Sequence, residues 1–192
     1  MRYPFTVFTV ALCLFFSTAC GDKISGQTKT FQPLSESGIY CFEGLEKGMS
    51  LDEVVKKLNL DKSKLVEVQS GMSYSEPFSF KEFDAKFYPY FYFEEDSRTN
   101  FYRGEYWASF DKETEFQTAC EQIVHFISEH LTDTPDWGSA ENLVNLSGND
   151  KTIVSSAQWA DKAQDGSTLA FYFQPMQIDN YASIRIVIDY SR

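Results

Sequence analysis

The chain has 192 residues, and 17 Lys and Arg stand against 28 Asp and Glu, so its formal net charge is −11. This acidity argues against a nucleic-acid partner, because phosphate contacts need clustered Lys and Arg. It fits a well-solvated surface or a basic protein partner attracted at long range. The length suits one domain, or two small halves packed closely together.

The first 19 residues have the layout of an export signal. Arg2 gives a basic start, a mostly apolar run extends from Phe5 to Phe16, and small residues lead to Cys20. A membrane-spanning helix needs about 20 apolar residues, so this run is too short to be one. We therefore expect residues 1–19 to be removed on export, which leaves 173 residues.

The segment Ser17-Thr18-Ala19-Cys20 resembles the lipobox of bacterial lipoproteins. The resemblance implies a diacylglyceryl group and palmitate-type acyl chains on Cys20, with the protein anchored in the cell envelope and facing the periplasm. More than one acyl chain gives lasting anchoring, at about 0.8 kcal/mol per buried methylene. Gly21 rather than Asp follows the cysteine, which is similar to cargo sent to the outer rather than the inner membrane. Ser17 stands where the family usually has Leu, so plain secretion, with Cys20 a stray thiol, is the alternative.

Cysteine usage predicts one disulfide. Cys13 would leave with the signal and Cys20 would be acylated, so Cys41 and Cys120 remain. Two remaining cysteines in an oxidising compartment favour a bond between them. It would close a loop of 78 residues and stabilise the fold by about 4 kcal/mol. Two buried free thiols are the alternative, and a zinc site lacks further ligands at the right spacing.

Polar residues precede the folded part of the chain. Residues 20–37 are rich in Ser, Thr and Lys and lack periodicity, so they predict a flexible tether. A single domain over 38–192 is expected to follow. It begins with a helix at about 50–60, where Ser50 and Glu53 have the spacing of a capping box.

Strands are predicted at about 64–70, 86–94 and 101–110. The second of them alternates two kinds of aromatic residue. Phe87, Phe91 and Phe93 belong to one face, whereas Tyr88, Tyr90 and Tyr92 belong to the other. Pro89 cannot donate a ladder hydrogen bond, so we expect this strand at a sheet edge or bulged at that residue.

The second half repeats this order of elements. A helix is predicted at about 112–131, with Cys120 on its apolar stripe, and strands follow at 152–160, 168–174 and 183–190. The prediction is an α+β fold in which helices pack on one face of an antiparallel sheet and leave the other face wet. The order also suggests a tandem helix-plus-three-strand repeat, with halves at 38–111 and 112–192.

The segment from Leu45 to Leu58, with its Gly48-Met49-Ser50 and Glu53-Val54, resembles a stretch of small bacterial lipoproteins. Their fold is shared by BamE, of the outer-membrane barrel assembly machine, and the β-lactamase inhibitory protein. The resemblance covers about 15 residues of the chain. It implies helices on an antiparallel sheet and binding rather than catalysis, with the inhibitor using an aromatic-rich sheet face. The Gly-x-Pro that usually follows the helix in the assembly subunit is absent here.

The tyrosine row is the candidate partner-binding site. Tyr88, Tyr90 and Tyr92, extended by Tyr172 at an outward position of its own strand, offer large contact area at low entropic cost. The alternative is that these rings pack under a loop or cover a sheet edge. Neither His125 nor His130 has metal-ligand spacing, and we expect both at the surface. No Gly-x-Ser-x-Gly elbow nominates a nucleophilic serine, and no cofactor or metal is expected.

These patterns lead to one functional expectation and two alternatives. We expect a non-enzymatic cell-envelope lipoprotein that binds a protein partner, as an inhibitor or immunity protein. The first alternative is a structural or assembly subunit of an envelope complex. The second is a hydrolase whose site is assembled from dispersed carboxylates.

Overall fold

A computed structural model describes the main part of the chain, comprising residues 28–35, 38, 40–94, 98–130, 135, 137–138, 152–154, 157–162, 168–178 and 181–190. These residues form two α-helices, a short 3-10 helix and a mixed sheet of eleven strands, so the fold is α+β, as predicted. The predicted signal sequence and Cys20 lie outside the described residues.

The elements follow one another along the chain as β1 (Thr28–Lys29), α1 (Leu51–Leu58), η1 (Lys62–Lys64), β2 (Leu65–Val68), β3 (Gly71–Tyr74), β4 (Phe78–Phe80), β5 (Lys86–Phe93), β6 (Phe101–Phe110), α2 (Glu113–His130), β7 (Trp137–Gly138), β8 (Thr152–Val154), β9 (Ala157–Lys162), β10 (Thr168–Ile178) and β11 (Tyr181–Asp189). Both predicted helices are confirmed. The predicted strand at 101–110 coincides with β6, whereas the sequence did not indicate β1, β3, β4 or β7.

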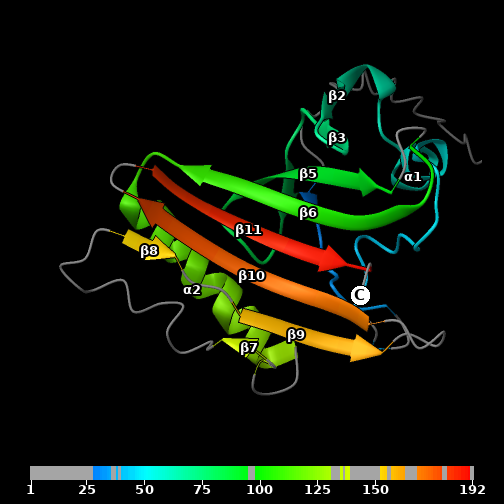
Figure 1. Ribbon diagram of the computed structural model, residues 1–192. Helices are drawn as coiled ribbons and strands as arrows, with labels where there is room; N and C mark the ends of the chain where they lie inside the picture. Colours follow the sequence, from blue (N-terminus) through cyan, green and yellow to red (C-terminus); the bar gives the residue numbers. More distant parts are fainter. Residues whose placement is uncertain are drawn as a thin grey trace, which may run out of the picture.

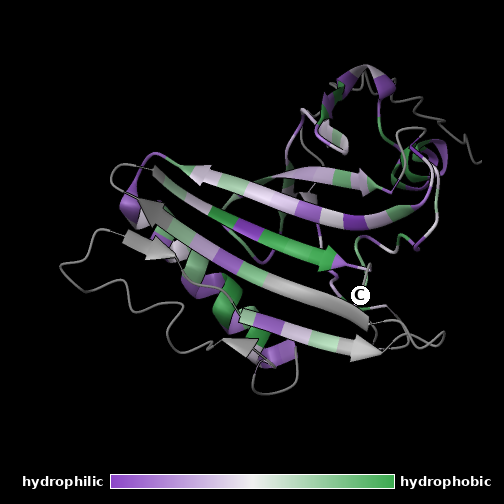
Figure 2. Ribbon diagram, in the orientation of Figure 1, coloured by the Kyte–Doolittle hydropathy of each residue, from purple (hydrophilic) through white to green (hydrophobic). Residues whose placement is uncertain are grey.

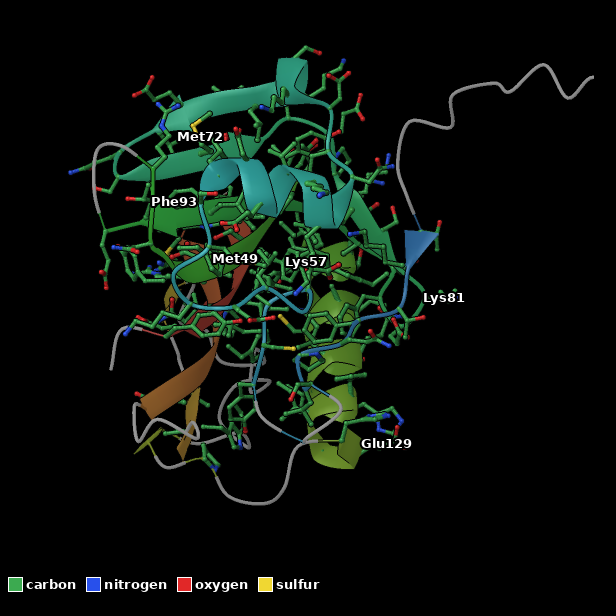
Figure 3. All side chains as sticks on the ribbon, turned by 90° about the vertical axis from the view of Figure 1, so that its right-hand side faces the viewer. Met49, Lys57, Met72, Lys81, Phe93 and Glu129 are labelled. Atoms are coloured by element: carbon green, nitrogen blue, oxygen red, sulfur yellow. The ribbon has the colours of Figure 1, made fainter. Side chains whose placement is uncertain are left out.

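The main path of the sheet runs β1-β4-β5-β6-β11-β10-β9-β7, and β6 and β11 pair at its centre. All pairs are antiparallel except β1 with β4. Figure 1 looks onto one face of this sheet, with α2 lying behind it. Figure 3 shows the same arrangement from the side, with α2 running down to Glu129 on one side of the strands.

The two longer hairpins are β5–β6 and β10–β11. In each of them, the outer edge of the first strand pairs with two short strands, one after the other. β4 pairs with Lys86 and Phe87 of β5, whereas β3 pairs with residues 90–92 of the same edge. Pro89 falls in the gap between them, where its missing N–H leaves no ladder bond unmade. The expectation of an edge strand or of a bulge at Pro89 is wrong, because β5 lies inside the sheet and its register shift falls between Tyr92 and Phe93. Pro175 occupies the same kind of gap in β10, between the residues that pair with β9 and those that pair with β8.

Helix α1 begins as its sequence predicts. The Ser50 hydroxyl accepts the Glu53 N–H at 3.4 Å, and the Glu53 carboxylate accepts the Ser50 N–H at 2.8 Å. These two bonds satisfy donors that the first turn of a helix leaves unpaired. Asn59, in a left-handed conformation with φ of 53°, ends the helix.

An aromatic core fills the space between the sheet and the helices. Helix α2 contributes Phe116, Ala119, Cys120, Ile123, Phe126 and Ile127. Phe87 and Phe91 of β5 are 0% exposed and Phe93 is 3% exposed, as the alternation predicted. The Phe42 ring lies so close to Gly104 of β6 that an added Cβ would be 2.1 Å from it. Neither helix in the described part of the chain has the length and apolar character needed to cross a bilayer.

The predicted tether extends too far toward the domain. Thr28 and Lys29 form β1 and pair with β4, and Phe31 is only 3% exposed within the core. Leu34 forms an isolated bridge with Tyr40. Because this segment is mostly polar, its sequence did not indicate that Phe31 is buried in the core. The pairing of β1 with β4 shows that the domain includes residues from Thr28 onward.

Candidate functional site: the open face of the sheet

The sheet face opposite α2 carries the predicted tyrosine row. Tyr88 is 41% exposed, and Tyr90 and Tyr92 are partly buried. We call this side the open face, because no helix of the described residues covers it (Figure 1). The three tyrosines therefore lie where the alternation with phenylalanine placed them.

Strand register shows which residues accompany the tyrosines, because directly paired residues share a face. Three rows cross the centre of the open face. The first row is Tyr88–Trp107–Arg185–Gln174, the second is Tyr90–Glu105–Val187–Tyr172, and the third is Tyr92–Arg103–Asp189–Ala170. Hydrophilic residues accordingly interrupt β6, whereas β11 is mostly hydrophobic (Figure 2).

Glu105 is the centre of this face. Its side chain is fully buried, and it accepts hydrogen bonds from Arg185 Nε at 2.8 Å and Arg185 Nη2 at 2.5 Å. The Trp107 indole N–H donates to it at 2.8 Å, and Arg103 forms an ion pair with it. A buried carboxylate needs this degree of pairing, because an unpaired one would lose several kcal/mol of hydration.

Aromatic rings flank the two arginines. The Arg185 guanidinium lies 5.2 Å from the Trp107 ring centroid, and the Arg103 guanidinium lies 5.1 Å from that of Tyr92. The Tyr90 and Trp107 rings are 6.1 Å apart. Such cation–π and ring contacts restrict the side-chain rotamers of the cluster.

Burial also sets the protonation of the cluster. Desolvation raises the pKa of the Glu105 carboxyl, and the Trp107 hydrogen bond and the Arg103 charge oppose that rise. Desolvation and then the Glu105 charge raise the pKa of Tyr92 to about 12. Tyr92 therefore keeps its proton at neutral pH and donates to Glu105 at 3.5 Å.

Exposed apolar area gathers on the same face. Among the described residues, the large hydrophobic side chains that are exposed are Val66, at 51%, and Tyr88, at 41%. Val66 pairs with Ser73, and Ser73 pairs with Tyr90, so Val66 belongs to the open face as well. Val66 and Tyr88 therefore both lie near Tyr90.

The fourth predicted tyrosine is placed only by its backbone. Tyr172 pairs with Val187 on one side and with Gln158 on the other, which continues the Tyr90 row. Its side chain lies outside what the structure describes.

The predicted disulfide is not formed. Cys41 and Cys120 are free thiols, both buried. Burial raises the pKa of the Cys41 thiol and raises that of Cys120 to about 12, so both stay protonated. The two sulfurs have different surroundings: Cys120 is packed in the aromatic core, where it serves as a small apolar group, whereas Cys41 lines an open groove.

Outside the open face, the described residues show a groove but no metal-binding cluster. An open groove of about 750 Å³ on the helix side is lined by Phe31, Pro33, Leu34, Cys41, Phe126 and His130, among others. His125 and His130 are exposed, as predicted. No group of three His, Cys, Asp or Glu that could hold a metal occurs among the described residues.

Sequence reasoning missed the charged residues of the site. Both faces of β6 carry aromatics, so Trp107 could not be assigned to a face, and Arg185 is 80 residues from Glu105 along the chain. The available signal was Glu105 itself, a charged residue in the middle of a strongly aromatic strand.

The chain was compared with protein-family models, curated proteins and solved structures, and no match was found.

Proposed function

We propose that the chain is a non-enzymatic cell-envelope lipoprotein that binds a protein partner through the open face, as an inhibitor or immunity protein. The observation that carries this proposal is the position of Val66 and Tyr88. These exposed hydrophobic side chains lie on the sheet face that also carries the Arg103–Glu105–Arg185 cluster. Large rings around a preformed polar centre are typical of residues that dominate protein interfaces.

The burial and pairing of Glu105 favour binding over catalysis. A general acid or base must reach its substrate, whereas Glu105 is 0% exposed and engaged by two arginines and an indole. Its role is to hold the arginines in place. The rows around it then form a rigid surface that loses little side-chain entropy on association.

We also propose the finer architecture, a duplicated unit over residues 38–111 and 112–192. Its support is a set of matching positions. Pro89 and Pro175 occupy equivalent gaps, and each pairs with a buried residue of the next strand, Tyr106 and Ile184 respectively. A two-fold axis relating the halves would pass through the Trp107–Arg185 pair. A fragment of residues 28–111 should then dimerise through β6, and a strictly monomeric fragment in sedimentation would count against duplication.

Partner capture tests the functional proposal. A C-terminally tagged full chain is expressed in a bacterial envelope, cross-linked and purified, and the recovered proteins are quantified. The double variant Tyr88→Ala/Val66→Ser should lose the partner by about tenfold or more, because both side chains would be at the interface. His125→Ala, an exposed change on α2, is the control. Equal recovery by the double variant would remove the open face from the proposal.

The anchor has an independent test. Cells are labelled with a lipid precursor, and the wild-type chain should carry label whereas Cys20→Ser should not. A Cys20→Ser protein that still carries label would contradict acylation at this residue. Loss of label without loss of partner capture would separate anchoring from recognition.

A further inference from the structure

The charges that reach solvent on the open face have the opposite sign to the whole chain. Lys86 is exposed, and the side chains of Arg103 and Arg185 keep 27% and 26% of their surface. The acidic residues of the same rows are withdrawn from solvent, Glu105 at 0% and Asp189 at 8%. A chain of net charge −11 therefore presents cations here. Such local contrast selects the orientation and chemistry of a partner.

The two arginines differ in how many of their donors are used. Arg185 donates from Nε and Nη2 to Glu105, and from Nη1 to Gln174 at 3.1 Å. Arg103 makes the ion pair with Glu105, while its Nε is buried and has no hydrogen-bond partner among the described residues. Guanidinium groups bind carboxylates best when two donors face both oxygens. Arg185 is therefore engaged at all three of its nitrogens, whereas the 27% of the Arg103 side chain that reaches solvent can still meet a carboxylate.

Apolar surface adjoins Arg103. Its guanidinium lies over the Tyr92 ring, and Tyr92 follows Tyr88 and Tyr90 along the same face of β5. Val66 lies two strands away in the Tyr90 row. A ligand that meets this arrangement must offer an anionic group together with apolar or aromatic groups.

We propose that the open face binds an acidic docking segment of a protein, in which an Asp or Glu carboxylate pairs with Arg103 and neighbouring apolar side chains cover Tyr88 and Val66. This proposal rests on the proposed function, since it names the chemistry of the partner for the same face.

A displayed library of short random peptides provides the test, with the full chain immobilised through its C-terminus. Peptides selected by the wild type should contain Asp or Glu beside an aromatic or aliphatic residue. Each selected peptide is then resynthesised with Asn or Gln in place of the acid, and binding should weaken about tenfold, as for a close interfacial ion pair. Arg103→Gln should abolish this preference for acid over amide.

Two further variants keep the test specific. Lys112→Gln removes an exposed cation on another part of the surface, where Lys112 pairs with Glu115, and it should keep the acidic preference. Arg103→Lys keeps the charge but loses the planar donor pair, so it should keep only part of the preference. Urea unfolding of each variant shows whether the fold is intact.

The outcomes are distinguishable. Selected peptides without acidic residues that still depend on Tyr88 would overturn the acidic segment and leave the proposed function standing. Peptides that bind Tyr88→Ala as well as the wild type would overturn both. Failure to select any acidic peptide, concentration-dependent self-association through Tyr88, or binding of a neutral polysaccharide at this face would each overturn the proposal.

Discussion

Arg185 and Glu105, which belong to β11 and β6, form a two-point contact in which Nε and Nη2 of the arginine face the two carboxylate oxygens at 2.8 and 2.5 Å. Val187 and not Arg185 is the direct pairing partner of Glu105, so the arginine reaches diagonally across the strand pair. This contact joins the two central strands of the sheet by side chains as well as by their backbone ladder.

Arg185→Gln should destabilise the protein by about 3–5 kcal/mol, because it leaves a buried carboxylate with one arginine instead of two. Urea unfolding measures the change. Lys112→Gln, which breaks the exposed pair with Glu115, should change stability by about 1 kcal/mol or less. If Arg185→Gln had an effect as small as this control, Glu105 would not depend on Arg185 for its burial.

Truncating two neighbouring residues of β5 should lower the free energy of unfolding by very different amounts. Phe87→Ala should cost about 3–5 kcal/mol, because Phe87 is fully buried. Tyr88→Ala should change the free energy of unfolding by about 0.5 kcal/mol or less, because its ring is 41% exposed. Thermal and urea unfolding of the two variants give the comparison. A large loss for Tyr88→Ala would mean that its ring is packed under another segment.

Gly104→Ala should destabilise the fold by about 1–3 kcal/mol, because the new methyl group would displace the Phe42 ring. The close approach is to three ring atoms of Phe42, at 2.1 to 2.5 Å from the added Cβ. Ser109→Ala, at an exposed position of the same strand, is the control. Unchanged unfolding of Gly104→Ala would show that the Phe42 ring moves aside without loss.

Stability should fall as the pH rises from about 9 toward 12. Burial raises the pKa of Cys120 from 9.0 and that of Tyr92 from 10.0, each to about 12. Below pH 9 the folded and the unfolded protein both keep these protons, so the two groups contribute fully to stability. Above pH 9 the unfolded chain releases its protons first. For each group the free energy of unfolding then falls by about 1.4 kcal/mol per pH unit, until the pKa of the folded state is reached. Urea midpoints across this range measure the slope, which should be smaller for Cys120→Ala. A flat profile would contradict burial of these groups.

The two domain thiols should be shielded rather than bonded. A thiol-reactive probe should modify Cys41 and Cys120 slowly in the native protein and quickly in denaturant, because both are buried. Peptide mapping without reductant should find two unlinked cysteine peptides. Recovery of a linked Cys41–Cys120 peptide pair from the purified protein would refute the free-thiol state.

Local signals in the sequence were sufficient for the two helices and for β5 and β6, whereas the single strand predicted at 152–160 is two strands, β8 and β9. The capping box of Ser50 and Glu53 predicted the start of α1, and the phenylalanine–tyrosine alternation predicted which side of β5 is buried. Both depend on residues within a few positions of each other, so chain geometry alone determines them.

Long-range pairing could not be predicted in the same way. β4 has three residues and pairs with both β1 and β5, so its own composition says little. The Arg103–Glu105–Arg185 cluster depends on the pairing of β6 with β11, and that pairing follows from how the whole sheet assembles. The tyrosine row was therefore visible in the sequence, whereas the charges beside it were not.

Pro89 and Pro175 lie at two places where the neighbouring position in the sheet passes from one short strand to another, β4 to β3 beside Pro89 and β9 to β8 beside Pro175. At such a junction an ordinary residue would turn an N–H toward a position that neither short strand reaches. Both prolines are buried, so that N–H would lack water as well as a partner, at a cost of about 1–3 kcal/mol. By carrying no donor, the two prolines allow two short strands to follow one another along one edge without leaving a buried polar group unsatisfied.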